Sequence, residues 1–189
     1  MLDVCAGTGD LALLCAEALQ GQGWVVGVDL NAAMLALAAR KSSRGGVAVS
    51  WAQGDALALP FRANTFDRVF VGFSMRNLSD LQAGLCEMVR VLRPQGRLVI
   101  VETGYPRHPV LRMGYHLFLG SIARVIGWLL TGRCWPFAWL SRSARQFLEP
   151  RAFLEYVRST GTTATYVPLS HGLASLYVGT KTTSDWVVS

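Results

Sequence analysis

The sequence has few acidic residues, almost no lysine and no closely spaced cysteines. Of its 189 residues only 16% are charged and 51% are hydrophobic, a balance that excludes an intrinsically disordered chain. The cysteines form no Cys-x-x-Cys pair and have no histidine cluster near them. We therefore expect no metal site, and free thiols in a reducing compartment such as the cytoplasm or an organellar stroma or matrix.

The positive charge is unevenly distributed along the chain. The formal net charge of +6 comes almost entirely from arginine, because Lys41 and Lys181 are the only lysines, and arginines are concentrated in residues 105–160. A basic surface suits nucleic acid, an anionic membrane or an acidic substrate. No lysine patch is interleaved with aromatic residues, so we expect no nucleic acid. We expect peripheral contact with an anionic membrane surface, and a homodimer is left open.

Strand and helix patterns alternate through the first half of the chain. Residues 24–30 are apolar and end at an acid, as is typical of a buried parallel strand. Asn31 is suited to cap the helix that follows. Further strands are predicted at 47–51, 67–73 and 97–103. This alternation predicts an α/β fold with a mainly parallel sheet and helices on both faces.

The second half of the chain begins differently. Residues 79–82, SDLQ, have the spacing of a capping box, and Pro94 and Gly96 are expected to end the helix that it starts. Residues 113–130 then form a long apolar stretch with helical character. Charged and polar residues interrupt it, so a helical insert over a hydrophobic pocket is favoured above a membrane span. A helix at 150–159 and an antiparallel hairpin, 163–169 with 174–181, are predicted to close the fold.

Polar residues and glycines gather where the predicted strands end. Gly7, Thr8 and Gly9 follow the first strand beside a helix N-terminus, where backbone N–H groups suit a polar or anionic ligand. Ligands bind at this edge of a parallel sheet. Other residues at this edge are Asp3, Asp29, Asp55, Ser74, Arg76, Asn77 and Glu102. The glycine spacing and Asp29 alone also fit a dinucleotide site such as one for NAD, or a turn without a ligand.

Further motifs narrow this choice by resemblance. The chain resembles class I S-adenosylmethionine-dependent methyltransferases in the segments DVCAGTGD, GVDL, GDALALPF, FDRV and RVLRPQGRLVIVE. It is similar to the ubiquinone/menaquinone biosynthesis C-methyltransferase family in GFSMRNLSD, in ETGYP and in SHGLASLYVGTK. The resemblance implies a Rossmann-like, seven-stranded sheet in a single domain, 1–189. Within it we expect a cofactor-binding half (1–104), a helical substrate-side insert (105–160) and closing strands (161–189).

The family resemblance also implies a reaction. It implies S-adenosyl-L-methionine as cofactor, and C-methylation of a lipophilic, prenylated quinol in menaquinone, ubiquinone or phylloquinone biosynthesis. Another hydrophobic acceptor, or a lid-less cofactor-binding protein without activity, are the alternatives left open. The family usually starts with a further helical region that this sequence does not show, so we expect N-terminal structure to precede Met1 in an active enzyme. Gln95 stands where the family commonly has glycine.

The resemblance assigns most of the polar edge to the cofactor. Asp3 is expected to bond its ammonium group and Asp29 its ribose hydroxyls, while Asp55 is expected to read the adenine. Glycines in the turn let the backbone approach the methionine part closely. The expected cofactor-binding residues are Asp3, Gly7, Thr8, Gly9, Asp29, Leu30, Asp55, Ala56 and Ser74.

Arg76 and Asn77 are the expected catalytic residues. The methyl group is already activated, so the protein has to hold a quinol oxygen, stabilise its negative charge and exclude water. Arginine is a poor base, so Arg76 is expected to hold that oxygen or an ordered water, with Asn77 orienting it. An ion pair of Arg76 with Asp80 is the structural alternative. Glu102 is a candidate to anchor this network, or a structural acid paired to an arginine. Tyr115 and His116 are candidates for lining the quinol pocket.

Overall fold

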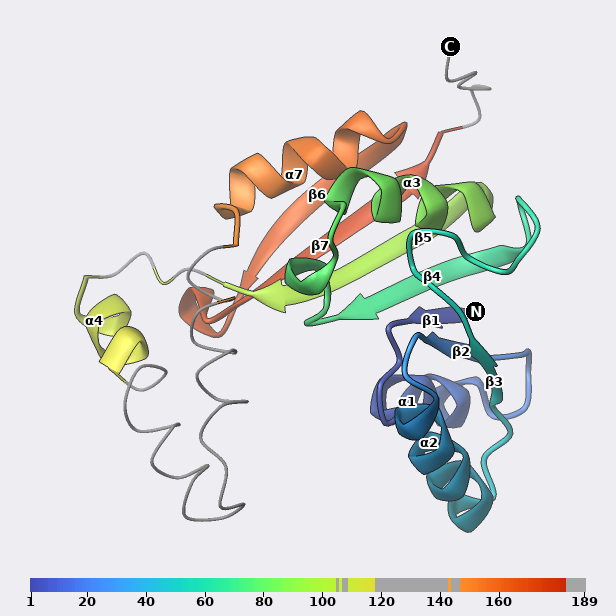
Figure 1. The fold of residues 1–189 in the computed structure, drawn as a ribbon. Coiled ribbons are helices and arrows are strands. Elements are labelled where there is room, and N and C mark those ends of the chain that lie inside the picture. Colours follow the sequence, from blue (N-terminus) through green and yellow to red (C-terminus); the bar gives the residue numbers. More distant parts are fainter. Residues whose placement is uncertain (105, 107–108, 118–142, 144–146, 183–189) are drawn as a thin grey trace.

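The computed structural model describes residues 1–104, 106, 109–117, 143 and 147–182. One sheet of seven strands has the order β3-β2-β1-β4-β5-β7-β6, with parallel pairing from β3 to β5 and antiparallel pairing of β7 with β5 and β6 (Figure 1). This confirms the predicted Rossmann-like sheet with a closing hairpin. The strands are β1 (Leu2–Val4), β2 (Val26–Asp29), β3 (Ser50–Gln53), β4 (Phe66–Gly72), β5 (Leu92–Thr103), β6 (Thr162–Leu169) and β7 (Ala174–Lys181).

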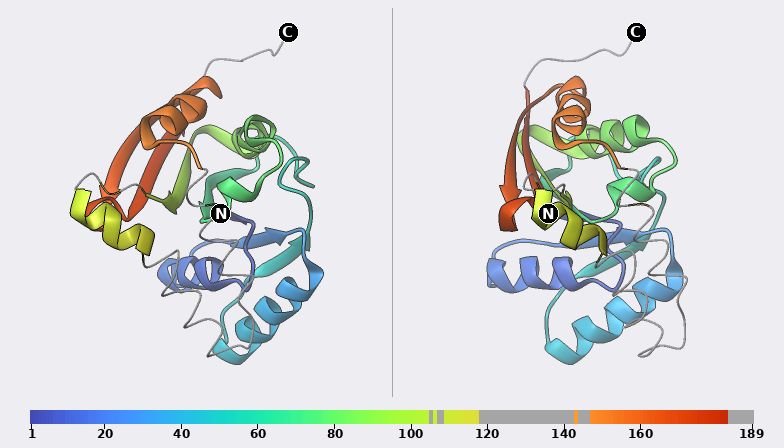
Figure 2. Two further views of the ribbon diagram at one scale, coloured as in Figure 1. Left: turned by 60° about the vertical axis from the view of Figure 1, so that its left-hand side comes forward. Right: turned by 90° about the vertical axis from the view of Figure 1, so that its left-hand side faces the viewer.

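The helices cover the two ends of the sheet. Figures 1 and 2 show α1 and α2 beside β1 to β3, and α3 and α7 over β4 to β7. The Gln82 side chain of α3 bonds Ser159 of α7 at 3.3 Å, so these two helices lie side by side. The described helices are α1 (Asp10–Leu19), α2 (Ala32–Gly45), α3 (Leu81–Val91), α4 (Pro109–Leu117) and α7 (Pro150–Ser159), with short 3-10 turns η1 (Met75–Asn77) and η3 (Ser170–Gly172).

The central strand β1 explains why the chain opens on an apolar segment. It pairs with β2 on one side and β4 on the other, and Leu2 and Val4 are fully buried. Strands covered on both faces read as continuous apolar runs. Asp3, between these two residues, is also buried. A carboxyl group in the middle of this strand therefore needs a reason other than packing.

Two predicted boundaries are wrong for local reasons. The third strand begins at Ser50 rather than at residue 47, because Val47 still bonds the end of α2 through its N–H to the Ser42 carbonyl. The predicted capping box places the start of α3 one residue early. Asp80 is the N-cap, and its side chain accepts from Ala83 N at 2.9 Å. The helix therefore begins immediately after Asp80, whose side chain caps it.

The fifth strand is longer than predicted, because β5 begins at Leu92 rather than at residue 97. The remaining elements agree more closely with the structure. Asn31 caps α2 through both Ala33 N and Met34 N, and α7 and the closing hairpin lie where the sequence placed them. Most of the apolar stretch at 113–130 lies outside the described residues, which include only its start in α4. Within the described parts of the chain, no helix combines the length and the apolar character that crossing a bilayer requires.

Gln95 occupies a conformation that favours glycine. It is exposed, lies inside β5 and has φ 64°, in the left-handed region where a Cβ is strained. Gln95→Gly is expected to raise the free energy of unfolding by about 1 kcal/mol, measured by urea denaturation. Gln95→Ala keeps the Cβ and is the matched control. Equal stability of the two variants would contradict the assignment of strain to this backbone.

Candidate functional site

A pocket of about 340 Å³ opens at the carboxyl ends of β1, β2, β3 and β4. The strand order reverses between β1 and β4, and such a switch point is where doubly wound sheets bind ligands. The pocket lining is Val4, Cys5, Val28, Asp29, Leu30, Gly54, Asp55, Ala56, Leu57, Ser74, Asn77, Leu78 and Ser79. It therefore brings together most of the predicted site residues, namely Asp29, Leu30, Asp55, Ala56, Ser74 and Asn77.

Asp29 is fixed by the backbone on both sides of it. Its Oδ2 accepts from Gly7 N and its Oδ1 from Asn31 N, each at 2.8 Å. The side chain ties the end of β2 to the glycine turn after β1. Each carboxylate oxygen can accept a second hydrogen bond, so Asp29 keeps acceptor capacity for a ligand in the pocket that it lines.

The loop after β3 forms the next wall of the pocket. Asp55 is exposed, and its Oδ1 accepts from Leu57 N at 2.9 Å in a local turn. Ala56 between them is buried in the core. Glycine at position 54 lets Pro60 pack closely against the backbone of this loop, since a Cβ there would lie 2.8 Å from Pro60 Cδ. The turn thus presents Asp55 and Leu57 to the pocket from a packed base.

The predicted glycine turn lies outside the lining of this pocket. Gly7 has φ +55° and open space around a built Cβ, so it is free to face a ligand. A Cβ on Gly9 would lie 2.4 Å from Trp51 Cη2, so packing against Trp51 already requires glycine there. Thr8 Oγ1 donates to Asp10 Oδ2 at 2.7 Å, in an exposed network with Lys41. A cofactor contact at these three residues remains a prediction.

Asp3 is a buried carboxyl group whose hydrogen bonding is incomplete. It is 2% exposed, and Oδ2 has no hydrogen-bond partner among the described residues. Burial raises the pKa of Asp3 to about 7; a hydrogen bond from the Ala12 backbone opposes this rise, and the charge of Asp29 adds to it. Buried polar atoms are seldom left unpaired. A cationic group at Oδ2 would satisfy it, which fits the predicted ammonium contact.

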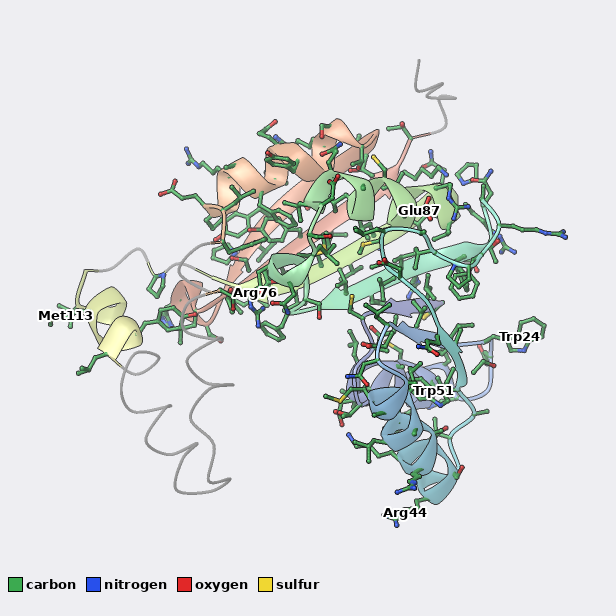
Figure 3. All side chains as sticks on the ribbon, viewed as in Figure 1. Trp24, Arg44, Trp51, Arg76, Glu87 and Met113 are labelled. Carbon is green, nitrogen blue, oxygen red and sulfur yellow. The ribbon has the colours of Figure 1, made fainter. Side chains whose placement is uncertain are left out.

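Arg76 makes a buried ion pair with Glu102, one of the two acids that the sequence offered as its partner. Its guanidinium Nη1 donates to Glu102 Oε1, and its Nε donates to Ser143 Oγ at 3.3 Å. Only 8% of the Arg76 side chain is exposed, and that of Glu102 is fully buried. The alternative of an Arg76–Asp80 pair is wrong, because Asp80 caps α3. Arg76, labelled in Figure 3, does not line the 340 Å³ pocket, whereas the next residue, Asn77, does.

Glu102 organises the end of β5 around this pair. Its carboxylate also accepts from Thr103 N at 2.7 Å and from Thr103 Oγ1 at 3.2 Å. Tyr115 of α4 is close enough to feel both charges: burial raises its pKa, Arg76 opposes the rise and Glu102 adds to it. The pair therefore lies between the sheet and the predicted substrate-side insert. The side chain of His116 is outside the described residues.

Several pocket residues escaped the sequence analysis. Cys5 follows β1 directly, so its place at a strand end was a usable signal. Burial raises the pKa of its thiol to about 12, and the charges of Asp29, Asp3 and Asp55 add to this, so it is a neutral wall group. Leu78 and Ser79 line the pocket because they directly follow η1, and no local sequence pattern predicts this short turn. Val4, Val28 and Gly54 read as ordinary strand and turn residues.

Comparisons with known proteins agree with this geometry. A model of the ubiE/COQ5 methyltransferase family matches residues 1–181. The chain is 36% identical over 181 residues to the demethylmenaquinone methyltransferase of Thermus thermophilus, covering 96% of this chain and 82% of that relative. It is 37% identical over 182 residues to the enzyme of the same name from Geobacillus kaustophilus, covering 95% and 78%.

Solved structures share the fold at low sequence identity. A SAM dependent methyltransferase from Aquifex aeolicus has a TM-score of 0.68 and 18% identity, covering 95% of this chain and 79% of that one. The phosphoethanolamine N-methyltransferase 2 of Haemonchus contortus, in complex with S-adenosyl-L-methionine, has a TM-score of 0.67 and 18% identity, covering 96% and 48%. These likenesses show a common architecture.

Proposed function

Because this chain belongs to the ubiE/COQ5 methyltransferase family, we propose that it methylates a ring carbon of a prenylated naphthoquinol of the demethylmenaquinol type. It is an S-adenosyl-L-methionine-dependent methyltransferase, and the names of its relatives support a demethylmenaquinone acceptor. The observation that carries the proposal is the pocket at the switch point, where Asp29 and Asp55 line an otherwise largely apolar cavity.

The residues present fit the cofactor. We assign its ribose hydroxyls to Asp29, its adenine to Asp55 with Leu30 and Leu57 on either side, and its ammonium group to Asp3. The orphaned Oδ2 of Asp3 and the acceptor capacity of Asp29 support these assignments. When bound, the cofactor supplies an activated methyl group. The chain therefore needs to supply binding, orientation and charge stabilisation.

Arg76, Asn77 and Glu102 are assigned the electrostatic part of this work. Transfer of the proton from a phenolic oxygen to water makes the adjacent ring carbon nucleophilic and leaves negative charge on that oxygen. A guanidinium does not accept this proton, but it stabilises the anion. Glu102 fixes the orientation of Arg76 and so acts as a positioning residue. Asn77, at the edge of the pocket, is placed to orient the same oxygen.

A methyl-transfer assay tests the proposed function. The protein is incubated with S-adenosyl-L-methionine and a panel of reduced acceptors, and products are identified by mass spectrometry. We expect one methyl group on a short-chain demethylmenaquinol and none on a sterol or a tocopherol precursor. Transfer to another acceptor in preference to the naphthoquinol would contradict the substrate assignment.

The cofactor site has its own variant. Asp29→Asn is expected to weaken binding of S-adenosyl-L-methionine about 10- to 100-fold in calorimetry, because it removes a charged acceptor from the pocket. Glu17→Ala, at an exposed position on α1, is the control and should bind like the wild type. Wild-type affinity in Asp29→Asn would exclude Asp29 from the cofactor site.

We also propose peripheral contact of α4 with an anionic membrane surface. Val110, Met113 and Leu117 follow helical spacing and are 63%, 69% and 60% exposed, in an arginine-rich part of the sequence. Figure 3 shows Met113 at the outer edge of the molecule. Met113→Asp is expected to reduce sedimentation with anionic vesicles, whereas Leu14→Asp on α1 should not. Equal binding of the two variants would contradict a role for α4.

A further inference from the structure

Helix α3 contains a buried glycine, Gly84, that lies against two leucines of the pocket lining, Leu57 and Leu78. A Cβ built on Gly84 would lie 2.6 Å from Leu78 Cδ1 and 3.4 Å from Leu57 Cδ2. Its φ is outside the left-handed region, so backbone conformation does not require glycine here. Glycine inside a helix is unfavourable by about 0.5–1 kcal/mol relative to alanine. The space that it leaves is filled by the leucines.

These leucines belong to two different walls of the pocket. Leu57 follows β3 in the turn made by Asp55, and Leu78 follows η1 next to Asn77. Both are partly buried, and Leu78 also packs against the core. Both walls therefore contact α3 at the same residue, Gly84.

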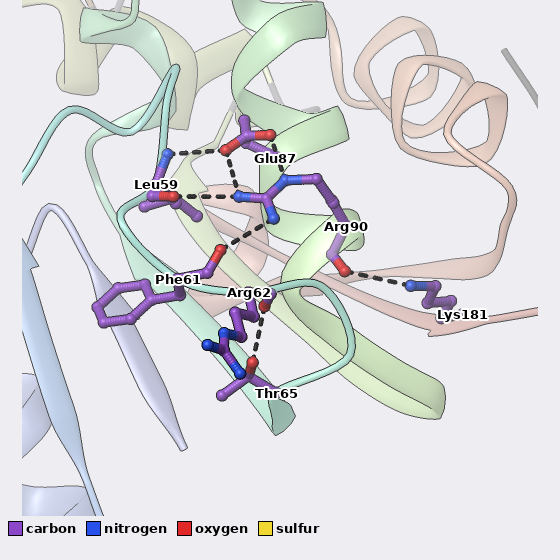
Figure 4. A network of polar contacts seen from close by, with 7 residues as sticks. All are labelled: Leu59, Phe61, Arg62, Thr65, Glu87, Arg90 and Lys181. Carbon is purple, nitrogen blue, oxygen red and sulfur yellow. Dashed lines mark hydrogen bonds and ion pairs between the residues drawn. The ribbon is translucent and has the colours of Figure 1, made fainter.

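The same side of α3 holds the loop after β3 in place (Figure 4). Glu87 Oε2 accepts from Leu59 N at 2.7 Å, while Arg90 donates to Leu59 O at 3.1 Å and to Phe61 O at 2.9 Å. Glu87 and Arg90 are also ion-paired with each other. Gly84, Glu87 and Arg90 are spaced three residues apart and so lie along one stripe of the helix. This stripe, 84/87/90, fixes the loop that carries Leu57.

From these contacts we propose that Gly84 sets the depth of the cofactor pocket, with Glu87 and Arg90 as positioning residues for its wall. The inference rests on the proposed function, because it takes this pocket as the cofactor site. A methyl group at residue 84 has to displace Leu78. The core lies behind that leucine and the loop is held by Glu87 and Arg90, so the displaced side chain enters the pocket.

The test separates affinity from stability. Gly84→Ala is expected to weaken binding of S-adenosylhomocysteine about ten-fold in a calorimetric titration, because the displaced Leu78 side chain occupies space that the ligand needs. Its free energy of unfolding should be unchanged or higher, since alanine favours the helix and only the end of a leucine has to move. The matched control is Gly45→Ala at the end of α2, where a Cβ would make an ordinary contact of 3.7 Å; its affinity should equal that of the wild type.

A second substitution keeps the test decisive if the single variant folds poorly. Leu78→Ala in the Gly84→Ala background removes the clash and is expected to restore affinity to within about two-fold of Leu78→Ala alone. Wild-type affinity in Gly84→Ala, or a loss that Leu78→Ala does not relieve, would overturn the inference. Failure of the wild type to bind S-adenosylhomocysteine would instead overturn the proposed cofactor pocket.

Discussion

Asp3→Asn is expected to stabilise the protein at pH 8 by far more than at pH 5. The folded-state pKa of Asp3 is about 7, above the ordinary value near 4, so the folded protein binds more protons than the unfolded chain between these values. Stability therefore falls as pH rises through this window in the wild type. Asparagine does not titrate. The stability advantage of the variant should grow on the order of 3 kcal/mol from pH 5 to pH 8.

Urea unfolding at the two pH values measures this difference, and Asp10→Asn provides the control. The pKa of Asp10 is lowered by its hydrogen bonds from Lys41 and Thr8, so its substitution should give no stability gain at high pH. The same Asp3→Asn variant is expected to bind the cofactor more weakly. If Asp3→Asn showed the same pH dependence of stability as the wild type, the pKa of Asp3 would not be raised by burial in the folded protein. Stability sacrificed at a ligand site is a common cost of function.

The second large effect concerns the Arg76–Glu102 pair. Glu102→Leu leaves Arg76 as a buried, unpaired charge and is expected to lower the free energy of unfolding by about 3–5 kcal/mol. Replacing both residues, Arg76→Met with Glu102→Leu, removes both charges and should recover most of that stability. Methyl transfer should nevertheless stay about 10²- to 10³-fold below the wild type, because the anion-stabilising donor is gone.

Stability and turnover of the double variant separate the two roles of this pair. Unfolding is followed by circular dichroism, turnover by product formation, and cofactor affinity by calorimetry. Cofactor affinity should be close to that of the wild type, because Arg76 does not line that pocket. A stable double variant with wild-type turnover would leave the pair with a structural role alone.

Local chemistry explains which features were predictable. Asn31 was recognised as a cap because capping needs only an acceptor before a helical pattern, and the structure places its Oδ1 on Ala33 N and Met34 N. Asp29 and Asp55 were found because strand ends converge on one edge of a parallel sheet. Ser79 and Asp80 both satisfy the capping rule, and only the actual path of the chain selects Asp80.

Features that depend on contacts between distant segments could not be predicted. Asp80 and Glu102 were both candidate partners of Arg76, and no spacing rule selects Glu102, which is separated from it by 26 positions. Gly9 looked like a ligand-facing glycine, yet Trp51 supplies a packing reason for it. Leu78 lines the pocket because it follows η1, a turn too short to give a periodic pattern in the sequence. Such residues are fixed by how strands and helices cross, which a single sequence does not display.

The last strand is attached to the far end of α3. Lys181 Nζ donates to Leu92 O at 2.7 Å and to Arg90 O at 3.4 Å, beside the junction where α3 passes directly into β5. A cation at this position complements the negative end of the helix dipole, where Arg90 O also accepts from Asn64 N at 3.0 Å. During synthesis, therefore, α3 emerges long before Lys181. A ribosome-bound chain stopped ahead of β7 is expected to hold the carboxyl end of α3 through Asn64 N and Thr65 N alone, without this cation.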